Sequence, residues 1–174
     1  MPTYAKRPVA GEFAPYYEPY IALVPDGDIA DILESQIKTT VAKLRPIPEE
    51  RGTFRYQPGK WSINDVVNHV NDTERVQTYR LLRIARGDKT PLPGFEEKDY
   101  AAVAGADGRD LSEIIDEFET IRRATLALVR SLDPEVWARR GIANTYDVSV
   151  QALAYIIAGH ELHHMNILRD RYSI

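Results

Sequence analysis

The sequence predicts an all-α protein, a four-helix bundle, and three observations support this prediction. Residues 59–90, 94–133 and 135–174 contain no proline, whereas five of the 11 prolines lie within residues 1–25. An interior proline costs a helix about 3 kcal/mol, so the three proline-free stretches can hold long helices. Apolar residues recur at helical spacing, and no segment shows the alternation typical of a strand. Four amphipathic helices need mutual burial, and a bundle is the simplest arrangement.

Capping residues mark the start of the first two helices. Asp28 can cap a segment whose apolar residues recur at helical spacing until two prolines end it. Ser62 can cap the second helix, with Asp65 three residues later in the arrangement of a capping box. We expect this second helix to extend to about Arg86, because Gly87 then provides a C-terminal break.

The third and fourth helices occupy the C-terminal half. The third begins near Asp110 and carries one apolar stripe. Pro134 ends it, and a short helix through Trp137 can follow. The fourth extends from Ser149 to about Tyr172. These boundaries complete a four-helix set of comparable lengths.

Two segments remain outside the four helices. The connection from residue 88 to residue 108 is longer than a usual helix-to-helix loop, and long loops often cover functional sites. Residues 1–27, rich in proline and tyrosine, are expected to pack on the bundle, which takes up residues 28–174. With 174 residues the chain is long enough for one core.

Composition excludes several classes of function. The absence of cysteine excludes disulfides, zinc ribbons, iron–sulfur clusters and a cysteine nucleophile. The 22 basic residues against 26 acidic ones give a formal charge of −4, which argues against a nucleic-acid partner. The longest apolar stretch, residues 152–159, is far shorter than the ~20 residues that a membrane span needs. The N-terminus has no hydrophobic secretion signal, so we expect a cytoplasmic protein.

All four histidines lie on the second and fourth expected helices, as His69 and as His160, His163 and His164. At 100° per residue, His164 lies about 40° from His160 and shares its apolar face, whereas His163 turns toward the rim at about −60°. Residues four apart have Cβ atoms about 6 Å apart, so His160 and His164 can bind one metal ion.

His69 is the natural third ligand, although the helical wheel alone does not require it. If the bundle runs up and down, the second and fourth helices are parallel, and His69 lies near the level of His160. The wheel places His69 about 85° from its apolar neighbours, which also allows a surface position. A single histidine on an apolar face is more often a core residue with a hydrogen-bond partner. Two buried imidazoles four residues apart would destabilise the fold if either became protonated. A bound metal ion removes this cost, because it binds the neutral imidazoles.

Three imidazoles without thiolates are typical of a catalytic metal site more than of a structural one. They leave a coordination position for water or a substrate atom, and imidazole suits zinc, nickel and iron. Asp72 could orient the His69 ring, and Glu74 and Glu161 could act as general bases. Solvated roles are at least as common for such charged residues, so the catalytic residues stay unassigned.

The sequence resembles the DinB-like superfamily, also called the YfiT-like metalloenzymes, over about residues 28–172. The motifs that carry this resemblance are His69-Val70-Asn71-Asp72-Thr73-Glu74-Arg75, Tyr79-Arg80, Ala85-Arg86-Gly87-Asp88, Pro91-Leu92-Pro93-Gly94-Phe95, Gly159-His160-Glu161-Leu162-His163-His164 and Arg171-Tyr172. The resemblance implies a four-helix bundle in which His69, His160 and His164 hold one divalent first-row metal ion. His163 is not part of the metal pattern.

The resemblance also implies a class of activity. Members with known activity are thiol S-transferases and isomerases that use low-molecular-weight thiols, so we expect a small-molecule substrate. A bound metal lowers the pKa of a thiol, and the thiolate can then attack an electrophile. Two alternatives stay open: a metal-dependent hydrolase, and a non-catalytic metal-binding or dimerisation module.

Apolar and aromatic residues that point away from the expected core faces predict a homodimer. Tyr79, Leu82, Tyr155 and Leu162 are such residues. The N-terminal segment could instead cover them.

Overall fold

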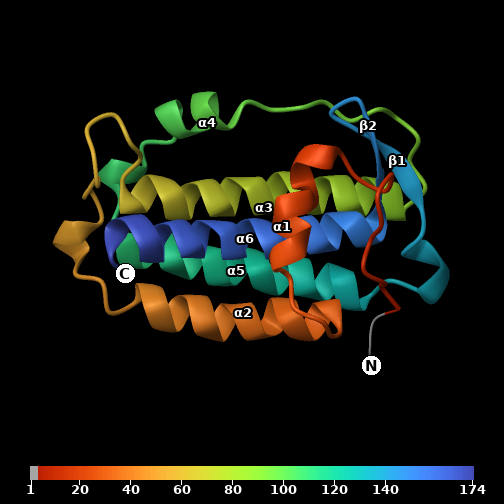
Figure 1. Cartoon of the computed structure of the whole chain (residues 1–174), viewed down its shortest axis with the longest axis horizontal. Coiled ribbons are helices and arrows are strands. Elements are labelled where there is room, and N and C mark those ends of the chain that lie inside the picture. Colours follow the sequence, from red (N-terminus) through yellow and green to blue (C-terminus); the bar gives the residue numbers. More distant parts are fainter. Residues whose placement is uncertain (1–3) are drawn as a thin grey trace.

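The computed structural model describes residues 4–174 of the chain; Met1–Thr3, the start of the expected N-terminal segment, lie outside the described residues. Four long helices form the bundle: α2 (Ile29–Leu44), α3 (Ile63–Ala85), α5 (Leu111–Arg130) and α6 (Val150–Tyr172). Shorter elements are α1 (Glu18–Leu23), α4 (Glu97–Val103), the strands β1 (Arg140–Ala143) and β2 (Tyr146–Ser149), and 3-10 turns at Pro15–Tyr17, Glu49–Arg51, Ala106–Gly108 and Pro134–Val136. The structure confirms the all-α four-helix bundle (Figure 1).

Side chains cap three of the four long helices at their first turns, and the sequence predicts two of these caps, Asp28 and Ser62. The Asp28 carboxylate accepts the first backbone N–H groups of α2, and Ser149 does the same for α6. Ser62 and Asp65 form the expected capping box of α3. Asp110 makes no side-chain cap at α5; instead Glu49, from a distant 3-10 turn, accepts the backbone N–H of Leu111 at 2.7 Å and that of its neighbour.

The directions of the helices differ from a simple up-and-down bundle. α3 and α5 run one way and α2 and α6 the other (Figure 1), so α3 is antiparallel to α6, and the expectation of parallel second and fourth helices is wrong. α3 packs between α6 and α5, and α2 packs against α5 and α6 on the opposite side. The connection from α3 to α5 must therefore return along the whole bundle. It does so with α4, which lies on α3, rather than as a bare loop.

A β-hairpin that the sequence analysis does not predict precedes α6. β1 and β2 pair antiparallel through four residue pairs, and Leu92 extends the pairing beside Ala143. Asn144 and Thr145 form the turn with φ of 49° and 68°, as tight hairpins require. The search for alternating apolar residues did not reveal these strands, because strands of four residues are too short to show alternation.

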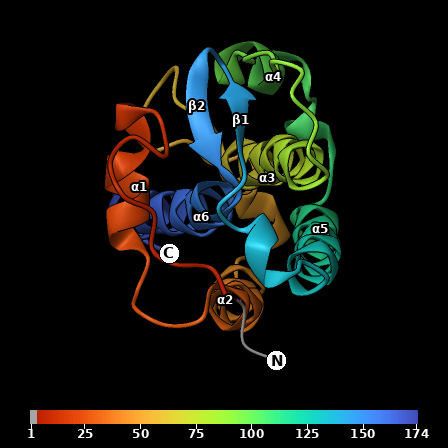
Figure 2. The same cartoon turned by 90° about the vertical axis from the view of Figure 1, so that its right-hand side faces the viewer.

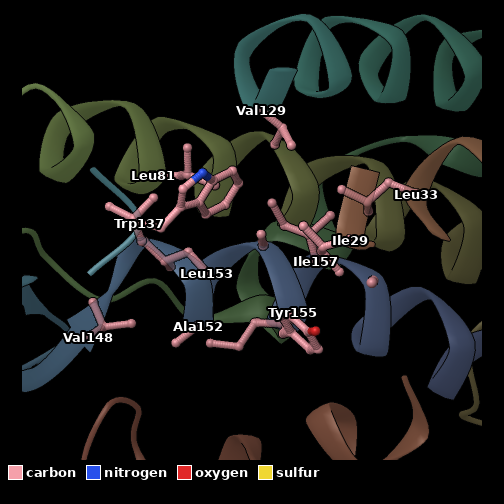
Figure 3. Close-up of a cluster of buried hydrophobic side chains, with 14 of the residues drawn as sticks. Ile29, Leu33, Leu81, Val129, Trp137, Val148, Ala152, Leu153, Tyr155 and Ile157 are labelled. Carbon is pink, nitrogen blue, oxygen red and sulfur yellow. The ribbon is translucent and has the colours of Figure 1, made fainter. Parts of the chain in front are cut away.

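A polar layer divides the bundle core into two apolar clusters. The larger cluster, at the end of the bundle near the hairpin, is drawn in Figure 3. The smaller one lies toward the C-terminus of α6 and includes Leu44, Val67, Ile115 and Met165. The residues between them are buried and polar, and each long helix contributes at least one: Gln36, Thr40, Glu74, Arg122 and Glu161.

Arg122 of α5 lies at the centre of this polar layer and is fully buried. It donates two hydrogen bonds to the Glu74 carboxylate, at 2.8 and 2.9 Å, and one to Glu161 at 2.6 Å. It also donates to the Gln36 side chain at 3.0 Å, and the Thr40 hydroxyl donates to Glu161. One guanidinium therefore links all four long helices.

The N-terminal segment lies across α6, and Figure 2 shows α1 beside that helix. Tyr155 is buried beneath it, with the Arg7 guanidinium 5.4 Å above its ring. Leu162 is half-buried, whereas Tyr79 and Leu82 are exposed. Within residues 4–174, no helix has the length and apolar character that crossing a membrane demands.

Gly159 allows the close approach of α1 to α6. A Cβ atom at this position would overlap the backbone carbonyl of Tyr20. We expect Gly159→Ala to lower the free energy of unfolding by about 1–3 kcal/mol, because the helices must separate. Urea denaturation measures this loss. Gly108→Ala is the control, since a Cβ there meets open space; equal stability of the two variants would contradict the proposed contact.

Candidate metal centre

Three of the four histidines meet in the interior of the bundle. His69 comes from α3, and His160 and His164 come from α6. The His160 Nε2 atom lies 3.0 Å from the His69 Nε2 and 3.1 Å from the His164 Nε2. One nitrogen of each ring lies within 4.8 Å of the other two. The helical wheel left the position of His69 open, and the structure buries it, with 4% of its surface exposed.

Burial keeps these imidazoles neutral. It lowers the pKa of His69 to about 4, with a smaller contribution from His163. The pKa values of His160 and His164 lie well below the ordinary value, first because of burial and then because of neighbouring imidazoles. A neutral imidazole has a lone pair available for a metal ion.

The donor set fits a divalent first-row metal ion. The three Nε2 atoms face one another, and a neutral ring can donate only one N–H, so hydrogen bonding among them leaves lone pairs directed at each other. A metal ion at about 2.1 Å from each nitrogen would use all three lone pairs. These observations support a metal here and do not identify it, since imidazole binds zinc, nickel and iron.

Aromatic rings surround the imidazole cluster. The Trp61 ring lies 4.9 Å from the His69 ring, and Tyr20 of α1 packs edge-on against His160 at 5.6 Å. His163 lies outside the cluster, half-buried, with its ring 4.9 Å from Tyr20. The His163 ring also packs against the His164 ring at 5.0 Å, but the nitrogens that converge are those of His69, His160 and His164.

A carboxylate and two cavities border the cluster. The Glu97 Oε2 atom of α4 lies 3.9 Å from the His69 Nε2. A cavity of about 540 Å³ is lined by His164, Trp61 and residues at the C-terminal end of α6. A second cavity of about 240 Å³ is lined by Glu97, Arg80 and aromatic residues. The first cavity therefore reaches the cluster at His164, and the second reaches Glu97, the carboxylate beside His69.

The three acidic candidates from the sequence do not contact the imidazoles. Asp72 accepts a hydrogen bond from Asn68 at 3.1 Å and pairs with Arg75 at 3.5 Å. Glu74 and Glu161 are both buried in ion pairs with Arg122. Neither glutamate is placed to act as a general base at the cluster.

The residues that match a known family span most of the bundle. Residues 32–168, which contain all three converging histidines, match the DinB superfamily. The chain belongs to the DinB superfamily.

Individual relatives agree with this family. A protein of Oceanobacillus iheyensis, named as a candidate metal-dependent hydrolase, is 26% identical over 145 residues, which cover 79% of this chain and 83% of that protein. The structure of YfiT from Bacillus subtilis, described as a candidate metal-dependent hydrolase with an unusual four-helix bundle topology, superposes with a TM-score of 0.69 at 16% identity. It covers 97% of this chain and 94% of YfiT.

A second solved structure with a similar fold is that of a mycothiol-dependent maleylpyruvate isomerase. It superposes with a TM-score of 0.62 at 11% identity, over 79% of this chain and 58% of the isomerase. At these identities, both superpositions show a shared fold.

Sequence reasoning missed Tyr20 and Glu97 as neighbours of the cluster. Both come from segments outside the four long helices, α1 and α4. The long connection after α3 was the available signal, because it suggested that a loop covers a site. It could not indicate which residue would face the histidines.

The ligand assignment can be tested with single substitutions. Replacing His69, His160 or His164 with Ala should weaken metal retention strongly, whereas His163→Ala should not. A metal that binds only the folded state stabilises it by about 4 kcal/mol at a thousandfold excess over Kd. Melting temperatures with and without chelator measure this effect: wild type and His163→Ala should both lose stability on chelation, and the other three should respond little. Equal metal loss in His163→Ala and His164→Ala would show that the ligand set is wrong.

Proposed function

We propose that this DinB-superfamily protein is a cytoplasmic metal-dependent enzyme of the thiol S-transferase type. In this proposal His69, His160 and His164 hold one divalent first-row metal ion, and a low-molecular-weight thiol and an electrophile are the substrates. The convergence of three Nε2 atoms at a buried site beside two cavities is the observation that carries the proposal.

The arrangement of the chain's own residues suits such a reaction. A metal bound by three imidazoles supplies a Lewis acid that lowers the pKa of a thiol or a water. The three imidazoles come from α3 and α6, and three protein ligands leave a coordination position for a substrate atom. Glu97 places a hydrogen-bond acceptor 3.9 Å from His69, where it can receive the proton of an approaching thiol. The Tyr20 and Trp61 rings restrict access of water.

The thiol assignment has two supports. The chain contains no cysteine that would compete with a thiol substrate for the metal or the electrophile. A protein with the same fold is an isomerase that depends on the thiol mycothiol.

A metal-dependent hydrolase is the second candidate, because a relative and a structural neighbour carry that description. It would use the same imidazoles with a water in place of the thiol. A sealed site would favour a non-catalytic module, and the cavity lined by His164 argues against a sealed site. A homodimer also stays a prediction, supported by the exposure of Tyr79 and Leu82.

Incubation of the metal-loaded protein with monochlorobimane separates the candidates. We expect conjugation that needs both metal and an added thiol, and that is lost in His160→Ala but kept in His163→Ala. Metal-dependent cleavage of chromogenic esters without any thiol would instead support the hydrolase. No metal-dependent turnover in either assay would contradict an enzymatic role.

A further inference from the structure

A second buried arginine differs from Arg122 in lacking an acidic partner. Arg80 of α3 has 3% of its surface exposed. Arg122, which is fully buried, is neutralised by Glu74 and Glu161. Within residues 4–174, no carboxylate forms an ion pair with Arg80. Burial of an unpaired charge costs free energy, so such a residue in a cavity wall is a candidate for ligand binding.

The Arg80 guanidinium retains donors that the protein does not use. Its Nη2 donates to the carbonyl of Pro93 at 2.7 Å, and its Nη1 makes a long contact of 3.4 Å with the Gln77 side chain. The Phe95 ring lies 5.7 Å away. A guanidinium carries five N–H donors in a planar fork that suits carboxylate and phosphate groups. Several donors therefore remain for a ligand.

The cavity lined by Arg80 also reaches Glu97, the carboxylate beside the imidazole cluster. It has a volume of about 240 Å³ and is lined by Arg80, Tyr17, Asn144 and the two carboxylates Glu96 and Glu97. Glu97 also lies 3.9 Å from His69. Arg80 follows His69 by 11 residues, which places it about 20° away on the same face of α3 and about 16 Å along the axis.

We propose that Arg80 binds the carboxylate or phosphate group of the substrate, whose reactive end lies at the imidazole cluster. This inference rests on the proposed function and narrows its substrate to small organic anions. Glu96 and Glu97 repel an anionic group from their part of the cavity. The ligand is therefore oriented with its anionic group on Arg80 and its thiol at Glu97.

A structural role for Arg80 makes a different prediction. If Arg80 only holds Pro93 and the connection before α4, its loss should weaken the binding of charged and neutral ligands alike. If it binds an anion, its loss should remove only the preference for the charged ligand. A matched pair of ligands therefore separates the two roles.

Titration calorimetry with 6-mercaptohexanoate and its methyl ester provides this pair. The metal-loaded wild type should bind the acid at least tenfold more tightly than the ester, which corresponds to about 1.4 kcal/mol. Arg80→Gln should bind both alike, and Arg80→Lys should keep part of the preference. Arg86→Gln removes the same charge from an exposed position directly after the end of α3 and should behave as wild type. Equal losses for acid and ester in Arg80→Gln, or no preference in the wild type, would overturn the proposal.

Competition with inorganic phosphate and with acetate identifies the anion. Displacement of 6-mercaptohexanoate by either one supports the anion site, and the stronger competitor indicates the substrate group; displacement by neither overturns it. Metal content is measured on every sample. If the wild type binds no metal, the proposed function fails, and the binding of acetate and phosphate to wild type and Arg80→Gln still tests the anion site by itself.

Discussion

The ion pairs of Arg122 are the interaction on which the rest of the structure depends. This guanidinium is fully buried and meets Glu74 of α3 and Glu161 of α6, while Gln36 of α2 completes its contacts. Glu161 directly follows His160, and Glu74 lies five residues after His69. The charges must pair to be tolerated inside the core, so they fix the register of α3 against α6. That register brings the imidazoles of the two helices to one point.

The long helices could be predicted because their signals are local. Asp28, Ser62 and Ser149 cap helices where the sequence indicates, and the helix ends agree within a few residues. The helix directions could not be predicted, because they depend on the long connection that carries α4 back along the bundle. The hairpin was missed because four-residue strands carry no periodicity, and its signal was confined to the turn at Asn144 and Thr145.

In the candidate site, too, the features that depend on local sequence could be predicted, and those that depend on packing between distant segments could not. His160 and His164 lie one turn apart on one helix, so their shared face followed from the sequence. The place of His69 depends on packing: α3 is covered on several sides, so its polar residues are buried as well as its apolar ones. Tyr20, Glu97 and the cavity at Arg80 depend on α1, α4 and the hairpin, whose positions no local pattern specifies. The sequence suggests Glu74 and Glu161 as general bases because they lie near the histidines along the chain. In the structure, their role is to neutralise Arg122.

The central claim is that His69, His160 and His164 hold one divalent metal ion. Elemental analysis of the protein, purified without a histidine tag, tests this claim most directly. We expect close to one equivalent of a first-row divalent metal per chain, either as purified or after reconstitution. Absence of bound metal in the wild-type protein after reconstitution with zinc, nickel and iron would contradict it.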